Sequence, residues 1–259
     1  MLAKNVWEDY IKPAKIFGNL YFIGVRAVCT HLIDTGDGLI IIDPGYYESL
    51  YLIINNIWEL GFKPKDIKYI VVTHAHYDHM DSVADLVAMT GAKTFIGKAD
   101  LPLLTGETYQ YPIRPFTPDV LLEDGDVISL GNTKIHCMST PGHTEGTMSF
   151  VFDVTDGKNT YRAGTFGGAG TNTLVRKFME EHNIPESARQ QYIDSIQRLK
   201  KEKVELFLGN HLPNNHTEEK LQLLGKQEEN PFIVGSQEQW LAFLEKRLSR
   251  FQQIIEKGD

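Results

Sequence analysis

Paired cysteines and long apolar runs are both missing from this chain of 259 residues. Its 2 cysteines, Cys29 and Cys137, lie far apart and outside any Cys-x-x-Cys spacing, which excludes a disulfide framework, so we expect two buried structural thiols. No apolar run approaches the roughly 20 residues of a membrane-spanning helix, and the first residues lack the apolar core of a secretion signal. We therefore expect no membrane partner and a cytoplasmic protein, although a secreted chain trimmed of its signal would have the same sequence.

Positive charge is also scarce. Lys and Arg number 26 against 34 Asp and Glu, which gives a formal net charge of −8. The densest basic stretch, residues 198–203, is interrupted by Glu202 and is typical of a solvated helix face. Because the chain has no broad positive field, we expect a small-molecule substrate and no nucleic-acid partner.

The pattern of apolar residues and turns predicts one domain over residues 1–259, since this length and a hydrophobic content of 42% can build one large core. Short apolar runs between turn residues predict strands, and apolar residues at helical spacing predict helices. In the first half we expect strands at 20–25, 30–33, 39–42 and 68–73, and helices at 48–60 and about 82–89. In the second half we expect strands at 127–130, 134–138 and 204–208, and helices near 190–200 and 237–255.

Two loops are expected at the rim of a pocket because they lie between elements that end near polar residues. One is the glycine-rich stretch from Gly164 to Gly170, and the other is the aromatic and proline-containing stretch from Tyr109 to Phe116. Loops of this kind commonly carry the residues that contact ligands.

A dense cluster of polar side chains follows the strand predicted at 68–73. His74, His76, Asp78 and His79 form a His-x-His-x-Asp-His motif of nitrogen and carboxylate donors, the kind that zinc prefers. Crowded behind an apolar strand, these groups would repel one another or lack partners without a cation. The motif therefore predicts a metal site at the carboxyl end of a strand, where open α/β folds place their sites.

Two later histidines also follow predicted strands. His143 comes after the turn at residues 140–142, and His211 comes after Gly-Asn at residues 209–210. His216 is close enough to compete with His211, but it lies in a polar loop. We favour His211 as the ligand because it directly follows the apolar strand.

Asp43, at the end of the strand predicted at 39–42, has two interpretations. Its carboxylate could accept the free ring N–H of a metal-ligating histidine and fix that ring's tautomer. It could equally cap the turn that Pro44 and Gly45 form. Three remaining histidines lie on strand or helix patterns without partners, and we expect structural roles for them: His31, His136 and His182.

Three stretches resemble the metallo-β-lactamase superfamily, and they span most of the chain from about Ile16 to His211. They are residues 73–79 with the metal motif, residues 140–144 with Thr-Pro-Gly-His-Thr, and residues 41–45 with Ile-Ile-Asp-Pro-Gly. The resemblance implies an α/β fold, the four-layer αββα sandwich. Softer similarities point to the third subclass of metallo-β-lactamases: residues 17–21, 115–119, 122–126 and 230–232.

Carried over residue by residue, the resemblance implies two Zn²⁺ per chain. One ion would be bound by His74, His76 and His143, and the other by a second set of three: Asp78, His79 and His211. Asp78 would also be catalytic, because it would orient the hydroxide that attacks the substrate. The chain has no Gly-x-Ser-x-Gly elbow, so no serine nucleophile is expected.

One departure from the wider superfamily narrows the expected chemistry. Glyoxalases, lactonases and phosphodiesterases of the superfamily use a carboxylate after the second-half strands to bridge both metals, but no Asp or Glu occurs between Asp156 and Glu180. We therefore expect a β-lactamase-like hydrolase that cleaves a cyclic or acyl amide with a metal-bound hydroxide. A lactone, ester or thioester hydrolase of the same fold is the first alternative, and an iron-binding oxidoreductase is the alternative from another class.

Overall fold

The computed structural model describes residues 6–104 and 113–258, and the strands and helices within them are as follows. The strands are β1 (Ala14–Phe17), β2 (Leu20–Phe22), β3 (His31–Asp34), β4 (Leu39–Ile42), β5 (Ile67–Val71), β6 (Lys93–Gly97), β7 (Val120–Leu122), β8 (Val127–Leu130), β9 (Thr133–Ser139), β10 (Met148–Thr155), β11 (Thr160–Thr165) and β12 (Leu206–Leu208). The α-helices are α1 (Leu50–Glu59), α2 (Tyr77–Met80), α3 (Val83–Thr90), α4 (Arg176–Glu181), α5 (Ser187–Leu199), α6 (Leu212–Asn215), α7 (Thr217–Leu223) and α8 (Ser236–Glu256).

The strands form two mixed sheets. The first has 7 strands in the order β1-β2-β3-β4-β5-β6-β7, antiparallel from β1 to β4 and parallel from β4 to β7. The second has 5 strands in the order β12-β11-β10-β9-β8, with only β11 and β12 parallel. Because β4 and β5 run the same way, the loops that follow them emerge at one edge of the first sheet.

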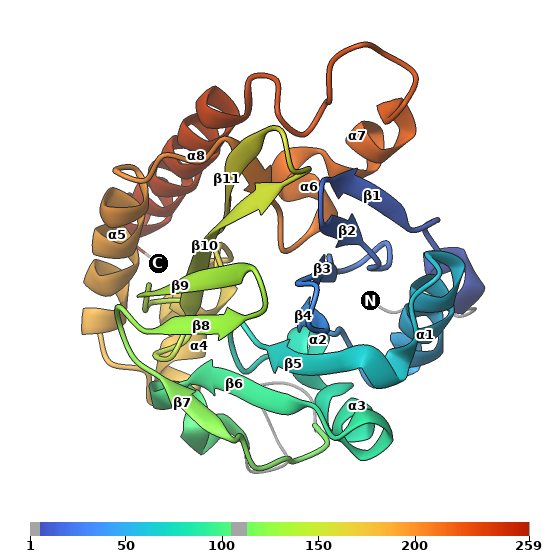
Figure 1. Cartoon of the computed structure of the whole chain (residues 1–259). Coiled ribbons are helices and arrows are strands. Elements are labelled where there is room, and N and C mark those ends of the chain that lie inside the picture. The colour runs from blue at the N-terminus through green and yellow to red at the C-terminus, as the bar shows by residue number, and fades with distance from the viewer. Residues whose placement is uncertain (1–5, 105–112, 259) are drawn as a thin grey trace.

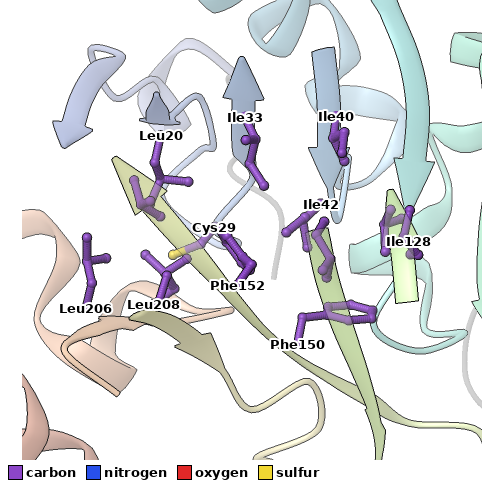
Figure 2. Close-up of a cluster of buried hydrophobic side chains, with 14 of the residues drawn as sticks. Leu20, Cys29, Ile33, Ile40, Ile42, Ile128, Phe150, Phe152, Leu206 and Leu208 are labelled. Carbon is purple, nitrogen blue, oxygen red and sulfur yellow. The ribbon is translucent and has the colours of Figure 1, made fainter. Parts of the chain in front are cut away.

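Side-chain alternation along β4 shows how the two sheets make a common core. Ile40 and Ile42 point into the cluster between the sheets, where Phe150 and Phe152 of β10 also lie (Figure 2). Leu39 and Ile41 belong instead to the cluster on the opposite face. A strand with apolar residues on both faces is buried on both, so an unbroken apolar run is expected for β4.

Helices cover both outer faces of the pair of sheets. Leu52 and Ile57 of α1 pack in the cluster behind the first sheet, to which α3 also contributes. Trp240 of α8 and Tyr192 of α5 pack behind the second sheet, and Figure 1 shows these helices on opposite sides of the molecule. The layers are therefore α, β, β, α, which confirms the predicted four-layer fold.

Most predicted elements are present, with shifted ends. The strand predicted at 20–25 ends at Phe22, and Val25 forms only an isolated bridge with Tyr10. Gly164 was predicted to open a loop, but it lies in β11 paired with Val151, so the loop begins after Thr165. A larger residue there would displace the Val204 side chain, because a Cβ would lie 2.7 Å from Val204 Cγ2.

Some of the features expected from the sequence involve residues that the structure does not describe. Residues 109–112 of the predicted aromatic loop are outside the described residues, whereas Ile113 is buried in the cluster behind the first sheet. Within the described ranges, no helix is long and apolar enough to cross a membrane. The assignment of residues 1–259 to one domain stays a prediction.

Candidate metal centre

Four strand ends bring the polar residues together at one edge of the sandwich. Asp43 follows β4, the His74 loop follows β5, His143 follows β9 and His211 follows β12. The parallel pairing of Ile42 with Val71 sets the first two of these loops beside each other. All six predicted ligands lie in two neighbouring groups at this edge.

The first group consists of His74, His76 and His143. One ring nitrogen from each lies within 4.8 Å of those of the other two. Their ring centroids are 4.6–4.8 Å apart and the rings are nearly perpendicular, so they surround a common point and do not stack. His74 and His143 are buried, and His76 begins the short helix α2 as its N-cap.

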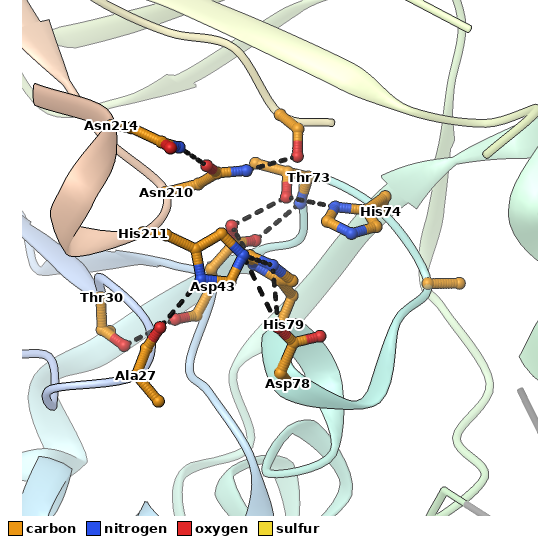
Figure 3. Close-up of polar contacts among 12 residues, drawn as sticks. Ala27, Thr30, Asp43, Thr73, His74, Asp78, His79, Asn210, His211 and Asn214 are labelled. Carbon is orange, nitrogen blue, oxygen red and sulfur yellow. Dashed lines mark hydrogen bonds and ion pairs between the residues drawn. The ribbon is translucent and has the colours of Figure 1, made fainter. Parts of the chain in front are cut away.

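The second group consists of Asp78, His79 and His211. The Nε2 atoms of His79 and His211 are 3.3 Å apart, and Asp78 Oδ2 lies 3.5 Å and 3.7 Å from them (Figure 3). His216 is absent from both groups of the described chain. It is exposed, in the left-handed backbone region, and lies 3.9 Å from Glu219.

The carboxylate of Asp43 is connected by hydrogen bonds to a histidine of each group. It accepts hydrogen bonds from the Thr73 backbone N–H at 2.8 Å, the Thr73 hydroxyl at 2.8 Å and His79 Nδ1 at 2.9 Å (Figure 3). The Thr73 hydroxyl in turn lies 3.0 Å from His74 Nδ1 and accepts its proton, because its own proton goes to Asp43. The carboxylate therefore contacts a histidine of the metal motif, as the first interpretation of Asp43 expects. The backbone of Asp43 has a φ of +52°, in the left-handed region.

Backbone carbonyls orient two more rings. His143 Nδ1 lies 3.1 Å from the Gly170 carbonyl, and His211 Nδ1 lies 2.8 Å from the Ala27 carbonyl. A carbonyl only accepts, so Nδ1 carries the proton in both rings, and Nε2 keeps its lone pair toward the centre. Such supporting hydrogen bonds are typical of metal-ligating histidines.

These tautomers create a need for a cation. His79 and His211 both donate from Nδ1 and therefore turn Nε2 lone pairs toward each other at 3.3 Å, which is favourable only with a proton or a metal ion between them. In the first group, His74 Nε2 is buried without a hydrogen-bond partner. An unpartnered buried nitrogen is costly, and a metal ion would satisfy it. The donor set and its geometry thus fit two metal ions.

The two groups differ in their affinity for protons. Burial, followed by the neighbouring histidines, holds the pKa of His74 and of His143 well below 6.5, and burial lowers the pKa of His76 to about 4. Burial also acts to lower the pKa of His79, but Asp78 and Asp43 outweigh it and raise that pKa. Burial, followed by His79, lowers the pKa of His211. The first group is therefore unprotonated near neutral pH, and in the second group His79 is the histidine that retains a proton more readily.

Burial favours a neutral carboxyl at Asp78 but is outweighed. The histidines around it, led by His79 and His211, lower the pKa of Asp78, so the group is an anion near neutral pH. Its side chain is 23% exposed and faces the pocket. Asp78 is the single carboxylate among the pocket-lining residues that the structure describes.

No carboxylate comes from β11. Gly164 and Thr165 occupy the end of this strand, and Thr165 is buried in register with Phe150 and Leu208. The glycine-rich loop that follows packs closely on the first group, since a Cβ on Gly168 would lie 2.7 Å from the Cβ of His143. The loop therefore shapes the site by close backbone approach and supplies no bridging ligand.

Sequence reasoning missed Asp100, which ties the two ligand loops of the first group together. This buried carboxylate accepts hydrogen bonds from the Ala75 N–H at 2.8 Å, the Gly146 N–H at 2.7 Å and the Thr144 hydroxyl at 2.9 Å. Ala75 lies between the first two ligands, and Thr144 follows the third. A lone Asp in the 3₁₀ helix Lys98–Leu104 gave no signal of this role.

A cavity of about 570 Å³ opens over both groups. Its wall also contains residues that are not predicted metal ligands: Arg26, Tyr77, Asn172, Phe178, Asn214 and Arg247. The other three histidines belong to neither group. His31 is buried in β3 with its pKa lowered to about 4 by burial, His136 is exposed, and His182 packs on Phe178.

Comparison with known proteins agrees with the four-layer fold and with the two groups of metal-binding residues. Residues 23–211 match the family model described as "Metallo-beta-lactamase superfamily". The fold is similar to that of BJP-1, a subclass B3 metallo-β-lactamase of Bradyrhizobium japonicum, with a TM-score of 0.89 and 28% identity over 97% of this chain and 96% of that one. LRA-12, a class B3 di-zinc metallo-β-lactamase from an Alaskan soil metagenome, gives a TM-score of 0.86 and 29% identity over 97% of each chain.

A curated relative comes from Bacillus subtilis strain 168 and is described as "Probable polyketide biosynthesis zinc-dependent hydrolase PksB". It is 31% identical over 163 residues, which cover 63% of this chain and 61% of the relative. The match therefore spans less than two thirds of that relative's length.

Proposed function

The chain belongs to the metallo-β-lactamase superfamily as a metallo-hydrolase, and from this premise we propose that it cleaves a cyclic or acyl amide, as in a β-lactam. We propose two zinc ions as its cofactors, one held by His74, His76 and His143 and the other by a second set of three: Asp78, His79 and His211. When bound, such ions lower the pKa of water toward neutrality and polarise a carbonyl.

The residues of the chain have separate tasks in this proposal. Asp78 is an anion that faces the cavity, so it accepts a hydrogen bond from the attacking water and orients it toward the substrate carbonyl. Asp43 and Asp100 do not line the cavity, and they hold the ligand loops in place. The closely packed loop at Gly168 and Gly170 forms one wall and keeps His143 in position.

A single observation carries the β-lactam-like assignment: two three-residue groups lie side by side with Asp78 as their only pocket-facing carboxylate among the described residues. A bridging carboxylate would place more negative charge between the ions. Without one, the pocket retains more positive charge to receive the nitrogen released from a strained amide. The similarity to subclass B3 structures over nearly the whole chain supports the same substrate class.

Hydrolysis of a lactone, ester or thioester is the second candidate. It is supported by the relative whose description names polyketide biosynthesis and no β-lactam. The same activated water can attack any of these carbonyls, because neither the fold nor the ligand set selects the leaving group.

A substrate panel distinguishes these candidates. The zinc-loaded protein is assayed with penicillins, carbapenems, acyl-lactones, thioesters and a phosphodiester, and kcat/KM is compared. We expect measurable hydrolysis of β-lactams and little action on the phosphodiester. If a thioester or phosphodiester were turned over far faster than every β-lactam, the amide assignment would be wrong, while the metal groups could still be correct.

A further inference from the structure

Two arginines line the cavity above the metal groups, and their surroundings differ. Arg26 is neutralised, because its Nη1 lies 2.6 Å from Glu218 Oε1. Arg247 of α8 forms no ion pair with any acidic residue in the described ranges. A partly buried guanidinium without a counter-ion is unusual, since desolvating a charge is costly unless an opposite charge compensates it.

Arg247 is nevertheless held firmly. Its Nη2 donates to Asn214 Oδ1 at 2.9 Å, and its guanidinium lies 5.1 Å from the ring centroid of Phe243. Asn214 Nδ2 donates in turn to Asn210 Oδ1 at 2.5 Å, as drawn in Figure 3, and Asn210 precedes the ligand His211. Hydrogen bonds through Asn214 thus connect the guanidinium to Asn210, the residue next to the ligand His211 in the chain.

With these contacts, the charge of Arg247 has no ion-pair partner and most of its N–H donors have no acceptor within the described residues. A guanidinium has five N–H donors, and one hydrogen bond to Asn214 uses one of them. Burial lowers the pKa of Arg247; Tyr192 acts in the opposite direction without outweighing burial, and the nearby Arg250 lowers it further, so the charge is only partly compensated by its surroundings in the described chain. An anion in the cavity would supply both the compensation and the missing acceptors.

We infer that Arg247 binds a carboxylate of the substrate at the wall of the cavity formed by α4, α6 and α8. The planar fork of the guanidinium matches a carboxylate with two parallel hydrogen bonds. The inference rests on the proposed hydrolase function and narrows it to anionic substrates. It makes Arg247 a specificity-determining residue that recognises a group of the substrate that takes no part in the bond cleavage.

A pair of substrates that differ only in charge tests this assignment. The pair is a chromogenic cephalosporin with a free ring carboxylate and its methyl ester. Arg247→Gln should lower kcat/KM for the carboxylate form by about 10- to 100-fold, mainly through KM, because charge-assisted hydrogen bonds are lost. The ester should change by less than about threefold, and Arg247→Lys should recover part of the loss because it restores the charge without the fork.

The matched control is Arg250→Gln, which removes the same charge one turn away on the exposed surface of α8. It should leave both substrates nearly unchanged. Calorimetric binding of benzylpenicilloate and of its thiazolidine monomethyl ester to the zinc-loaded variants repeats the comparison without turnover. An equal loss for the ligands with the free carboxylate and for those with the methyl ester in Arg247→Gln, or no loss for either, would overturn the assignment.

Failure of the proposed function gives a different result from failure of this inference. If the wild-type protein hydrolysed lactones and no β-lactam, the amide proposal would be wrong. The charge comparison would then be made with a lactone carrying a free carboxylate and its methyl ester. A selective loss of the charged lactone in Arg247→Gln would support the inference even in that case.

Discussion

Replacing Asp43 by Asn should weaken the second metal more than the first. The carboxylate accepts three hydrogen bonds of 2.8–2.9 Å, one of them directly from His79 Nδ1. An amide presents an N–H₂ group in place of one oxygen, so it favours the other His79 tautomer, whose Nε2 carries a proton and cannot bind a metal. Loss of such a supporting partner typically costs about 10- to 100-fold in metal affinity, or roughly 1.4–2.7 kcal/mol.

The first metal should be affected less, because Asp43 reaches His74 only through the Thr73 hydroxyl. The apo protein should lose about 1–3 kcal/mol of stability from buried donors that lose their acceptor. Competition with a chromophoric zinc chelator gives the two affinities, and urea unfolding of the apo form gives the stability.

Asp119→Asn is the matched control for this experiment. Asp119 accepts the backbone N–H of Thr94 at 2.8 Å and its hydroxyl at 2.9 Å, which reproduces the Asp43–Thr73 pair away from the metal groups. This variant should leave both zinc affinities unchanged. Equal weakening of both metals in Asp43→Asn, or wild-type affinity for both, would refute the argument from the His79 tautomer.

Three further predictions concern the same centre. His211→Ala should lose the second metal while His216→Ala keeps it, as measured by zinc content after dialysis, and the reverse result would contradict the ligand assignment. On acidification the second metal should leave first. The pKa of His79 is raised and that of His74 is strongly lowered, so protons displace the metal from His79 at a higher pH than from His74. Simultaneous release of both metals would count against this order. Asp100→Ala leaves three buried donors without their acceptor, so the free energy of unfolding in urea should fall by about 3 kcal/mol or more. The first zinc should also bind more weakly. Wild-type stability and wild-type zinc affinity would show that the two ligand loops do not depend on Asp100.

Sequence patterns predicted the elements that carry a clear local signal. The unbroken apolar run of β4 and the amphipathic repeats of α5 and α8 were placed to within a few residues. The central strand β10 was not predicted. Its first five residues are all buried, so it lacks the alternation that separates a strand from a buried helix. The strands β1 and β7, with 4 and 3 residues, are too short for any period and depend on pairing with their neighbours.

The residues of the site could be predicted where the ligands are close together in the sequence. They could not be predicted where the residues are far apart in the sequence. Four donors within six residues indicated a metal site, and strand ends pointed to His143 and His211. Asp100 is 46 residues from Gly146, and only the closure of the two sheets brings them together. Arg247 lies on the pocket side of α8, yet in sequence it is one of many charged residues of an amphipathic helix.

The metal content of the purified protein tests the central claim most directly. Inductively coupled plasma mass spectrometry should find two zinc ions per chain in the wild-type protein and one in His143→Ala. That variant should remain folded by circular dichroism but lose hydrolase activity, because one ligand of a three-ligand group is gone while the core is intact. Iron in place of zinc, or two zinc ions and full activity in His143→Ala, would contradict the account.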